Sequence, residues 1–214
     1  MNFSLYHISP ELILTVGGIL VLLLSVFVRK WGMPGRVGLF SPEALSIAVL
    51  LAALVPTFML FRDTQALAGI PQFGTMMTVD GLAIFFKIVA MISSILVILL
   101  SIDFFRDREY HRGEYYALIV FATLAITLVA ASTDLVMIYL SVEFLSITSY
   151  ILVGYLKGDR LSNEGALKYF LYGSVAAAVM IYGMSMLYGL TGTTSLLEIG
   201  EVLKAQGSNY ALLF

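Results

Sequence analysis

The chain has 214 residues, of which 60% are hydrophobic and only 12% are charged, and its formal net charge is −2. Soluble domains carry about 25% charged residues, so too few are present here to cover a water-facing surface. The charges form short islands between long apolar runs, which places the chain among membrane proteins. Cysteine is absent, His7 and His111 are isolated, and no basic stripe points to nucleic acid, so neither a metal site nor a nucleic-acid partner is expected.

Six apolar runs are long enough to cross the bilayer as helices, which takes about 20 residues and at least about 17. The first run lacks a preceding basic region and a cleavage pattern, so we expect it to be retained as a span. We therefore expect an all-α, polytopic transmembrane helix bundle that forms a single membrane domain over residues 1–214. The expected spans are 12–28, 44–61, 81–102, 115–133, 135–156 and 165–190.

Helix-start signals stand at several of these boundaries. Residues 9–11 and 41–43 both read Ser-Pro-Glu, which supplies a cap, a proline at the first helical position and an acid in the first turn. Asp80 and Asp134 are positioned to cap the third and fifth spans. The link between the fourth and fifth spans, at Thr133-Asp134, is very short, so these two helices should form a tight hairpin.

The chain changes character after the sixth span. Residues 195–198 read Ser-Leu-Leu-Glu, the form of a capping box, and apolar residues then recur at helical spacing. We expect an amphipathic helix over about 196–206 on the membrane surface, with an ordinary loop as the alternative. A new apolar run begins at Tyr210 and is too short to cross a bilayer, so we interpret it as the start of a truncated seventh helix.

Lysine and arginine predict the orientation of the chain, because they concentrate in loops on the cytoplasmic side. In the first, third and fifth loops they number eight, against two in the second and sixth. The N-terminus should therefore lie outside, and the odd-numbered loops inside. The eight are Arg29, Lys30, Arg36, Arg106, Arg108, Arg112, Lys157 and Arg160, and the two are Arg62 and Lys204.

Glu143 is the strongest candidate for function. It is the only charged residue between Leu135 and Leu156, and it lies about 4 Å from the middle of that run at 1.5 Å per residue. Its side chain cannot reach water from that depth, and an ionisable group inside a membrane is by default a functional hypothesis. We expect Glu143 to take up and release protons; the alternative is a static carboxyl group held by hydrogen bonds.

Lys87 and Lys168 are the other two candidates for proton transfer. Lys87 lies about 9 Å beyond Gly81, at a depth close to that of Glu143, so the two could pair if the third and fifth helices are neighbours. Lys168 is expected about one turn into the sixth span, too far from Glu143 for direct contact. For each lysine the alternative is snorkelling, in which a long stem carries the charge to the interface.

Three stretches carry a resemblance to a known family. Residues 134–155 (DLVMIYLSVEFLSITSYILVGY), 162–174 (SNEGALKYFLYGS) and 182–189 (YGMSMLYG) resemble the antiporter-like subunits of respiratory complex I. The second and third stretches are most similar to the N-type subunits, which include their chloroplast and mitochondrial counterparts. Val142 precedes Glu143, where the related L and M subunits and the Mrp antiporters usually have tryptophan. The similarity is strongest over about residues 80–205.

The resemblance implies a fold and a function. Such subunits have about fourteen helices in two inverted repeats, belong to the membrane arm of NADH–quinone oxidoreductase, and move protons when quinone is reduced elsewhere. Glu143 matches the family's fifth-helix glutamate, and Lys168 a lysine at the start of the sixth helix. The glutamate's usual partner, a lysine in a broken seventh helix, lies beyond Phe214.

The resemblance also implies partners and cofactors. Other membrane-arm subunits are expected as partners. NAD, FMN, iron–sulfur clusters and quinone are expected in the rest of the complex, with no catalytic, cofactor or metal site in this chain. A bacterial inner membrane is the expected location, with an organelle membrane as the alternative. Two other functions remain open, a stand-alone Mrp-type cation/proton antiporter subunit and a structural membrane subunit without conduction.

Overall fold

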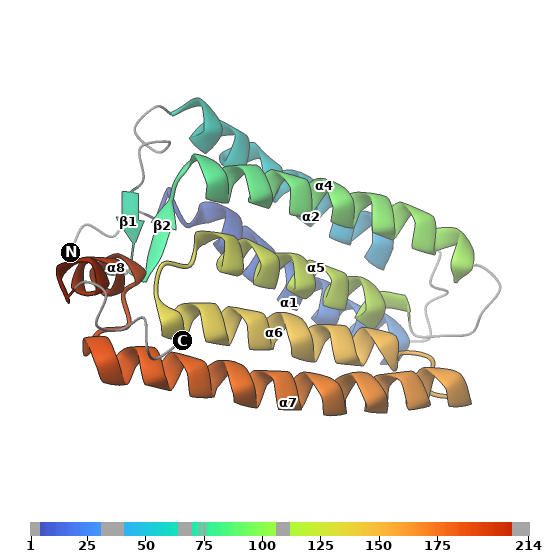
Figure 1. The fold of residues 1–214 in the computed structure, drawn as a ribbon. Coiled ribbons are helices and arrows are strands. Elements are labelled where there is room, and N and C mark those ends of the chain that lie inside the picture. The colour runs from blue at the N-terminus through green and yellow to red at the C-terminus, as the bar shows by residue number, and fades with distance from the viewer. Residues whose placement is uncertain are drawn as a thin grey trace.

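The computed structural model describes residues 5–30, 41–63, 70–72, 74, 76–105 and 112–206. In that part of the chain, seven α-helices and a two-stranded ribbon form an elongated bundle (Figure 1). The expected start of a seventh span at Tyr210 lies outside the described residues. The elements are α1 (Ser9–Lys30), α2 (Pro42–Arg62), β1 (Ile70–Gln72), β2 (Met77–Val79), α4 (Gly81–Phe104), α5 (Arg112–Ala131), α6 (Leu135–Val153), α7 (Arg160–Thr191) and α8 (Leu196–Gln206).

Six of these helices, α1, α2, α4, α5, α6 and α7, are long and apolar enough to span a membrane. Large apolar side chains cover their outer surfaces, as Leu100 and Val175 illustrate with exposed fractions of 78% and 66%. Such a surface is stable against lipid and not against water. The chain is therefore an integral membrane protein, and the expected all-α polytopic bundle is confirmed. The outside location of the N-terminus remains a prediction.

Side-chain caps begin three of the helices where the sequence predicted them. Ser41 caps α2, Asp80 caps α4 and Asp134 caps α6, each by accepting a backbone N–H from the first turn of its helix. These caps satisfy amide groups that have no partner within the helix. Asp159 does the same for α7 at 2.9 Å, and α7 therefore begins at Arg160, five residues before the expected start.

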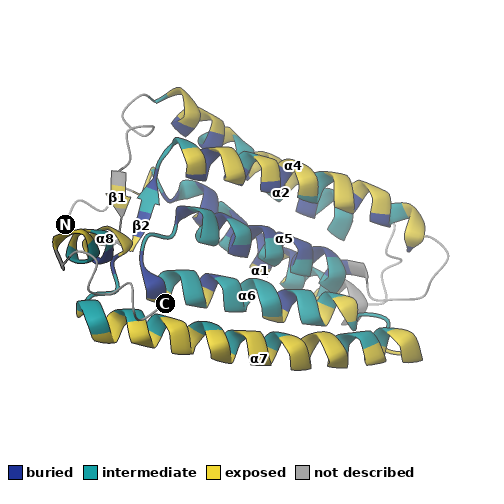
Figure 2. Ribbon diagram, in the orientation of Figure 1, coloured by how far each residue is buried: buried dark blue, intermediate teal, exposed yellow. Residues whose placement is uncertain are grey.

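Helix α5 lies at the centre of the bundle. It packs against α1, α4 and α6, while α2 packs against α1 and α4, and α7 packs against α6 on the outer side (Figures 1 and 2). Gly17 and Gly18 allow α1 to approach two neighbours closely, because Val49 of α2 and Phe121 of α5 occupy the space that a Cβ atom would need. The two glycines thus allow α1 to pack closely against α2 and α5.

The sequence analysis missed the β1–β2 ribbon, which pairs antiparallel at the end of the bundle where α4 and α6 begin (Figure 1). Backbone bonds tie this end together, since Thr133 donates its N–H to the Met76 carbonyl at 2.9 Å and Leu135 donates to Thr194 at 2.9 Å. The Thr194 hydroxyl also donates to Asp134. The cap of α6 is thereby fixed to the segment that follows α7.

The expected capping box of α8 is wrong in one detail. Glu198 accepts a hydrogen bond from the Thr193 hydroxyl, and not from the start of the helix at Ser195. The Ser195 N–H donates to the same Thr193 hydroxyl at 3.3 Å. The turn formed by Gly192, whose φ of 72° suits a residue without a Cβ atom, places Thr193 between the two helices and in reach of both groups.

One side of the bundle is open. None of the residues of α7 is buried within the described part of the chain, and only 11% of the apolar window of α6 is buried. Figure 2 shows exposed residues along the whole length of α7. With 32 residues, α7 is about 48 Å long at 1.5 Å per residue, which exceeds the hydrocarbon core of about 30 Å. Its ends must therefore project beyond the apolar layer.

Candidate functional site

Glu143 stands almost at the middle of α6. The helix ends at Val153 and not at 156 as expected, so Glu143 is one residue from its central position. Its side chain is half-buried, and within the described residues no hydrogen bond or ion pair holds it. The static interpretation, a carboxyl group held by hydrogen bonds from neighbouring helices, therefore finds no donor in this part of the chain.

The side of α6 that carries Glu143 faces α7. Tyr150 follows Glu143 by seven residues and so shares its helix face. The Tyr150 ring packs edge-on against Tyr169 and Phe170 of α7, and its hydroxyl occupies the space left by the missing Cβ of Gly173. Glu143 thus points toward the α6–α7 side of the bundle, which is its open side.

Lys168 does not reach Glu143. Its ammonium forms an ion pair of 2.6 Å with Glu164 one turn earlier on α7, and the two side chains are 65% and 49% exposed. Because its neighbour Tyr169 packs against Tyr150, Lys168 lies near the level of Tyr150, about 10 Å along the helix axis from Glu143. The prediction that Lys168 does not contact Glu143 directly is therefore confirmed. The predicted depth of Lys168 is wrong, because α7 begins at Arg160 and Lys168 lies more than two turns from the start of the helix instead of one.

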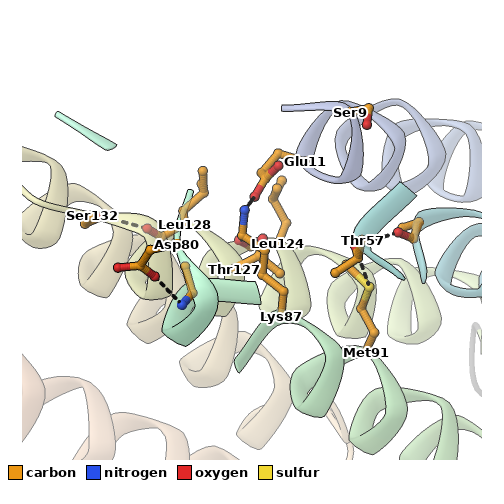
Figure 3. Close-up of polar contacts among 12 residues, drawn as sticks. Ser9, Glu11, Thr57, Asp80, Lys87, Met91, Leu124, Thr127, Leu128 and Ser132 are labelled. Carbon is orange, nitrogen blue, oxygen red and sulfur yellow. Dashed lines mark hydrogen bonds and ion pairs between the residues drawn. The ribbon is translucent and has the colours of Figure 1, made fainter. Parts of the chain in front are cut away.

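The hypothesis that Lys87 pairs with Glu143 is wrong, because α5 separates α4 from α6. Lys87 instead forms an ion pair with Glu11 of α1, with 2.6 Å between Nζ and Oε1. Figure 3 shows the two side chains pointing toward one another from their separate helices. The snorkelling alternative is also wrong, since the Lys87 side chain is 1% exposed and the Glu11 side chain 5% exposed.

The Glu11 carboxylate is held by charge alone. Its contact with Lys87 is an ion pair, and neither Glu11 oxygen accepts a hydrogen bond within the described residues. A buried carboxylate usually gains such donors, because an uncompensated lone pair away from water costs about 1–3 kcal/mol. The Nδ1 atom of His7, four residues earlier, is likewise buried and without a partner there.

Glu11 is the residue that the sequence interpretation missed, since its place in the first turn of α1 explained it as a favourable charge near a helix N-terminus. The sequence did contain a signal that could have identified Glu11 as the partner of Lys87. Glu11 and Lys87 lie about 3 Å and 9 Å from the starts of two helices that enter the membrane from the same side. A lysine side chain points back toward the helix start, which brings its charge to the level of Glu11.

An aromatic cluster closes the opposite end of the bundle. Phe105, Tyr115 and Tyr155 lie in edge-to-face contact, with centroid distances of 4.7 Å, 5.3 Å and 6.1 Å. Burial, and next the negative charge of Glu114, raise the pKa of Tyr155 to about 12. This phenol therefore stays protonated at physiological pH.

Comparison with known proteins places these residues in context. A family model described as the transmembrane part of NADH:quinone oxidoreductase and Mrp antiporters matches residues 132–214. NADH-quinone oxidoreductase subunit N of Anaeromyxobacter sp. (strain Fw109-5) is 41% identical over 197 residues, which cover 92% of this chain and 36% of the relative. Subunit N of Chlorobium chlorochromatii is 34% identical over the whole chain and 40% of its own length.

Solved structures give the same picture. A chain of respiratory complex I from Thermus thermophilus superposes with a TM-score of 0.69 at 26% identity, covering 87% of this chain and 38% of that one. A chain of an archaeal membrane-bound sulfane sulfur reductase has a TM-score of 0.76 at 16% identity, which shows a shared fold. The chain spans less than half the length of the curated relatives that it matches.

Proposed function

The chain belongs to the antiporter-like, N-type membrane subunits of NADH:quinone oxidoreductase, and on this premise we propose that it contributes to proton translocation driven by quinone reduction elsewhere in the complex. One observation carries the proposal. Glu143 is a lone carboxyl at the middle of a spanning helix, half-buried and without a partner in the described residues. A group in that position can accept a proton from one side and release it to the other.

The open side of α6 and α7 supports the same function. Glu143 faces this side, and the relatives are more than twice as long as this chain. We propose that further helices of a longer polypeptide cover the open side and supply the cation that pairs with Glu143.

We expect the redox chemistry to lie in other subunits. The chain has no cysteine for an iron–sulfur cluster and no glycine-rich dinucleotide motif. NAD, FMN, iron–sulfur clusters and quinone are therefore proposed to bind to partner subunits of the same assembly. A bacterial inner membrane is the proposed location, supported by the bacterial origin of the relatives.

An Mrp-type cation/proton antiporter is the second candidate, favoured by the family model, whose description includes both groups. Co-purification separates the two. A tagged, full-length form of the protein, solubilised in mild detergent, is expected to bring down flavin- and iron–sulfur-containing subunits that oxidise NADH. The flavin and iron absorbance of the purified material is the measurement. Isolation with other antiporter subunits alone, and without flavin, would favour the antiporter.

Lys168 gives a prediction about deprotonation. An anchor lysine needs only a long stem and a positive head, which arginine also supplies, whereas a relay lysine must lose its proton. The Glu164 ion pair is exposed and suits either residue. We expect Lys168→Arg to assemble normally and to pump poorly, with Lys168→Ala impaired as well. The measurement is proton uptake by reconstituted vesicles, normalised to assembled complex. Pumping by Lys168→Arg at the wild-type rate would make Lys168 a fixed charge.

A further inference from the structure

The Glu11–Lys87 pair is not needed to explain the fold. Replacing a buried ion pair by apolar side chains of similar volume is often neutral or stabilising, because removing two charges from water costs about as much as their attraction returns. The helices α1 and α4 are already placed by packing against α2 and α5, and a buried apolar cluster joins all four helices. Ionisable groups buried inside a membrane are, by contrast, characteristic of proton paths.

The pair also lacks the hydrogen bonds that usually surround a buried carboxylate. Neither Glu11 oxygen accepts a hydrogen bond from a described residue. Lys87 is its one charged contact in the described structure. Transfer of a proton from the Lys87 ammonium to Glu11 would give a neutral amine and a neutral acid. The net charge of the pair would be zero before and after the transfer.

Three other ionisable groups at this end of the packed helices are engaged elsewhere. Asp80 accepts the Ala83 N–H at 2.7 Å, Arg62 lies over the Phe58 ring, and Asp63 has its own interaction. His7 differs from them, and it stands four residues before Glu11 in the turn that precedes α1. Its Nδ1 atom is buried and has no partner among the described residues, while the residue as a whole is half-exposed.

A polar contact also lies on the inward side of Lys87. Ser94 follows Lys87 by seven residues and therefore shares its face of α4, about 10 Å further along the helix. Its hydroxyl forms a hydrogen bond of 2.6 Å with Thr123 of α5. Thr127, one turn from Thr123 toward Lys87, is fully buried. The interface of α4 and α5 thus carries hydroxyl groups between Lys87 and the interior of the bundle.

We propose that Glu11 and Lys87 form a second proton-exchange site of this subunit, separate from Glu143, with His7 as its connection to water at the end of the bundle where α1 begins. The inference rests on the proposed function. The Lys87 ammonium passes its proton to the Glu11 carboxylate, so that an N–H bond breaks and an O–H bond forms. Glu11 then protonates His7 at Nδ1, and the imidazolium releases a proton to water. The neutral Lys87 amine takes up the next proton from water, relayed by the Ser94, Thr123 and Thr127 hydroxyl groups of the α4–α5 interface.

The test uses the assembled complex in vesicles and measures protons translocated per NADH oxidised. The central variant is the double substitution Glu11→Gln with Lys87→Met, which removes both charges together and so leaves neither one buried alone. We expect it to assemble and to translocate protons at about a tenth of the wild-type rate or less, the scale of losing a positioned acid–base group. A purely structural pair predicts normal translocation, and that result overturns the inference.

A second variant tests the proposal independently if the double variant does not assemble. His7→Gln lies outside the ion pair and should fold, and we expect it to slow translocation about tenfold, with recovery when imidazole is added on the side where α1 begins. Unchanged translocation in His7→Gln overturns the inference as well. Glu43→Gln is the matched control, because Glu43 occupies the same Ser-Pro-Glu position at the start of α2, at the opposite end of the bundle, and should behave as wild type.

The two proposals fail in different ways. If Glu143→Gln abolishes translocation while the double variant and His7→Gln translocate normally, only the second exchange site is refuted. If Glu143→Gln itself translocates normally, the proposed function is refuted, whatever the Glu11–Lys87 variants show.

Discussion

Replacement of Glu143 by glutamine is expected to lower proton translocation by the assembled complex about tenfold or more, because glutamine keeps the shape of the side chain and cannot release a proton. Loss of assembly should be small. Glu143 is half-buried and makes no hydrogen bond or ion pair in the described structure, so its neutral isostere leaves no partner behind unpaired.

The measurement is the ratio of protons translocated to NADH oxidised, taken on vesicles that contain equal amounts of assembled complex. Electron transfer is expected to fall together with translocation if the two are tightly coupled. Glu43→Gln is the matched control, because Glu43 lies in the first turn of α2 and not on α6 or α7. A normal ratio in a fully assembled Glu143→Gln complex contradicts the role given to Glu143.

Removal of Lys87 alone is expected to cause the largest loss of stability. Lys87→Met leaves the Glu11 carboxylate buried with neither a countercharge nor a hydrogen bond in the described structure. Breaking a buried pair in this way typically costs about 3–5 kcal/mol. Uptake of a proton by Glu11 would relieve part of the penalty. We therefore expect the free energy of unfolding to decrease by about 3 kcal/mol.

Unfolding of the purified full-length subunit in detergent, followed by circular dichroism, checks this value. Adding Glu11→Gln to Lys87→Met should recover most of the loss, because the double variant has no buried charge left, and this pattern identifies direct coupling between the two residues. Lys157→Met is the control, since Lys157 is exposed and its loss should change stability by less than about 0.5 kcal/mol. Additive effects of the two substitutions would show that the ion pair does not couple them.

Much of the fold follows from the sequence for a physical reason. In hydrocarbon every backbone amide must be satisfied within its own helix, so a run of about 20 apolar residues has one outcome. By the same rule, a charged residue inside such a run is exceptional, and Glu143 was identified in this way. In the structure, α6 ends earlier than expected, and Glu143 is therefore closer to the middle of the helix than the sequence predicted. The caps at Asp80 and Asp134 were predictable because they depend on two or three neighbouring residues.

Other features depend on contacts between distant segments. The β1–β2 ribbon has only three residues in each strand, too few for a periodic pattern, and it is held by backbone bonds to the segment before α6. The Thr193–Glu198 bond depends on the turn after α7, and not on the helix start that the capping-box pattern describes. Each involves a geometry that local sequence does not encode.

The partner of Lys87 was decided by the tertiary structure alone. Position along a helix gives the depth of a charge in the membrane, and by depth Lys87 could have met either Glu143 or Glu11. Which helix stands beside α4 depends on close packing, in which Gly17 and Gly18 draw α1 against α2 and α5 while α5 separates α4 from α6. The sequence therefore determined how deep Glu11, Lys87 and Glu143 lie, and the packing of the helices decided which of them meet.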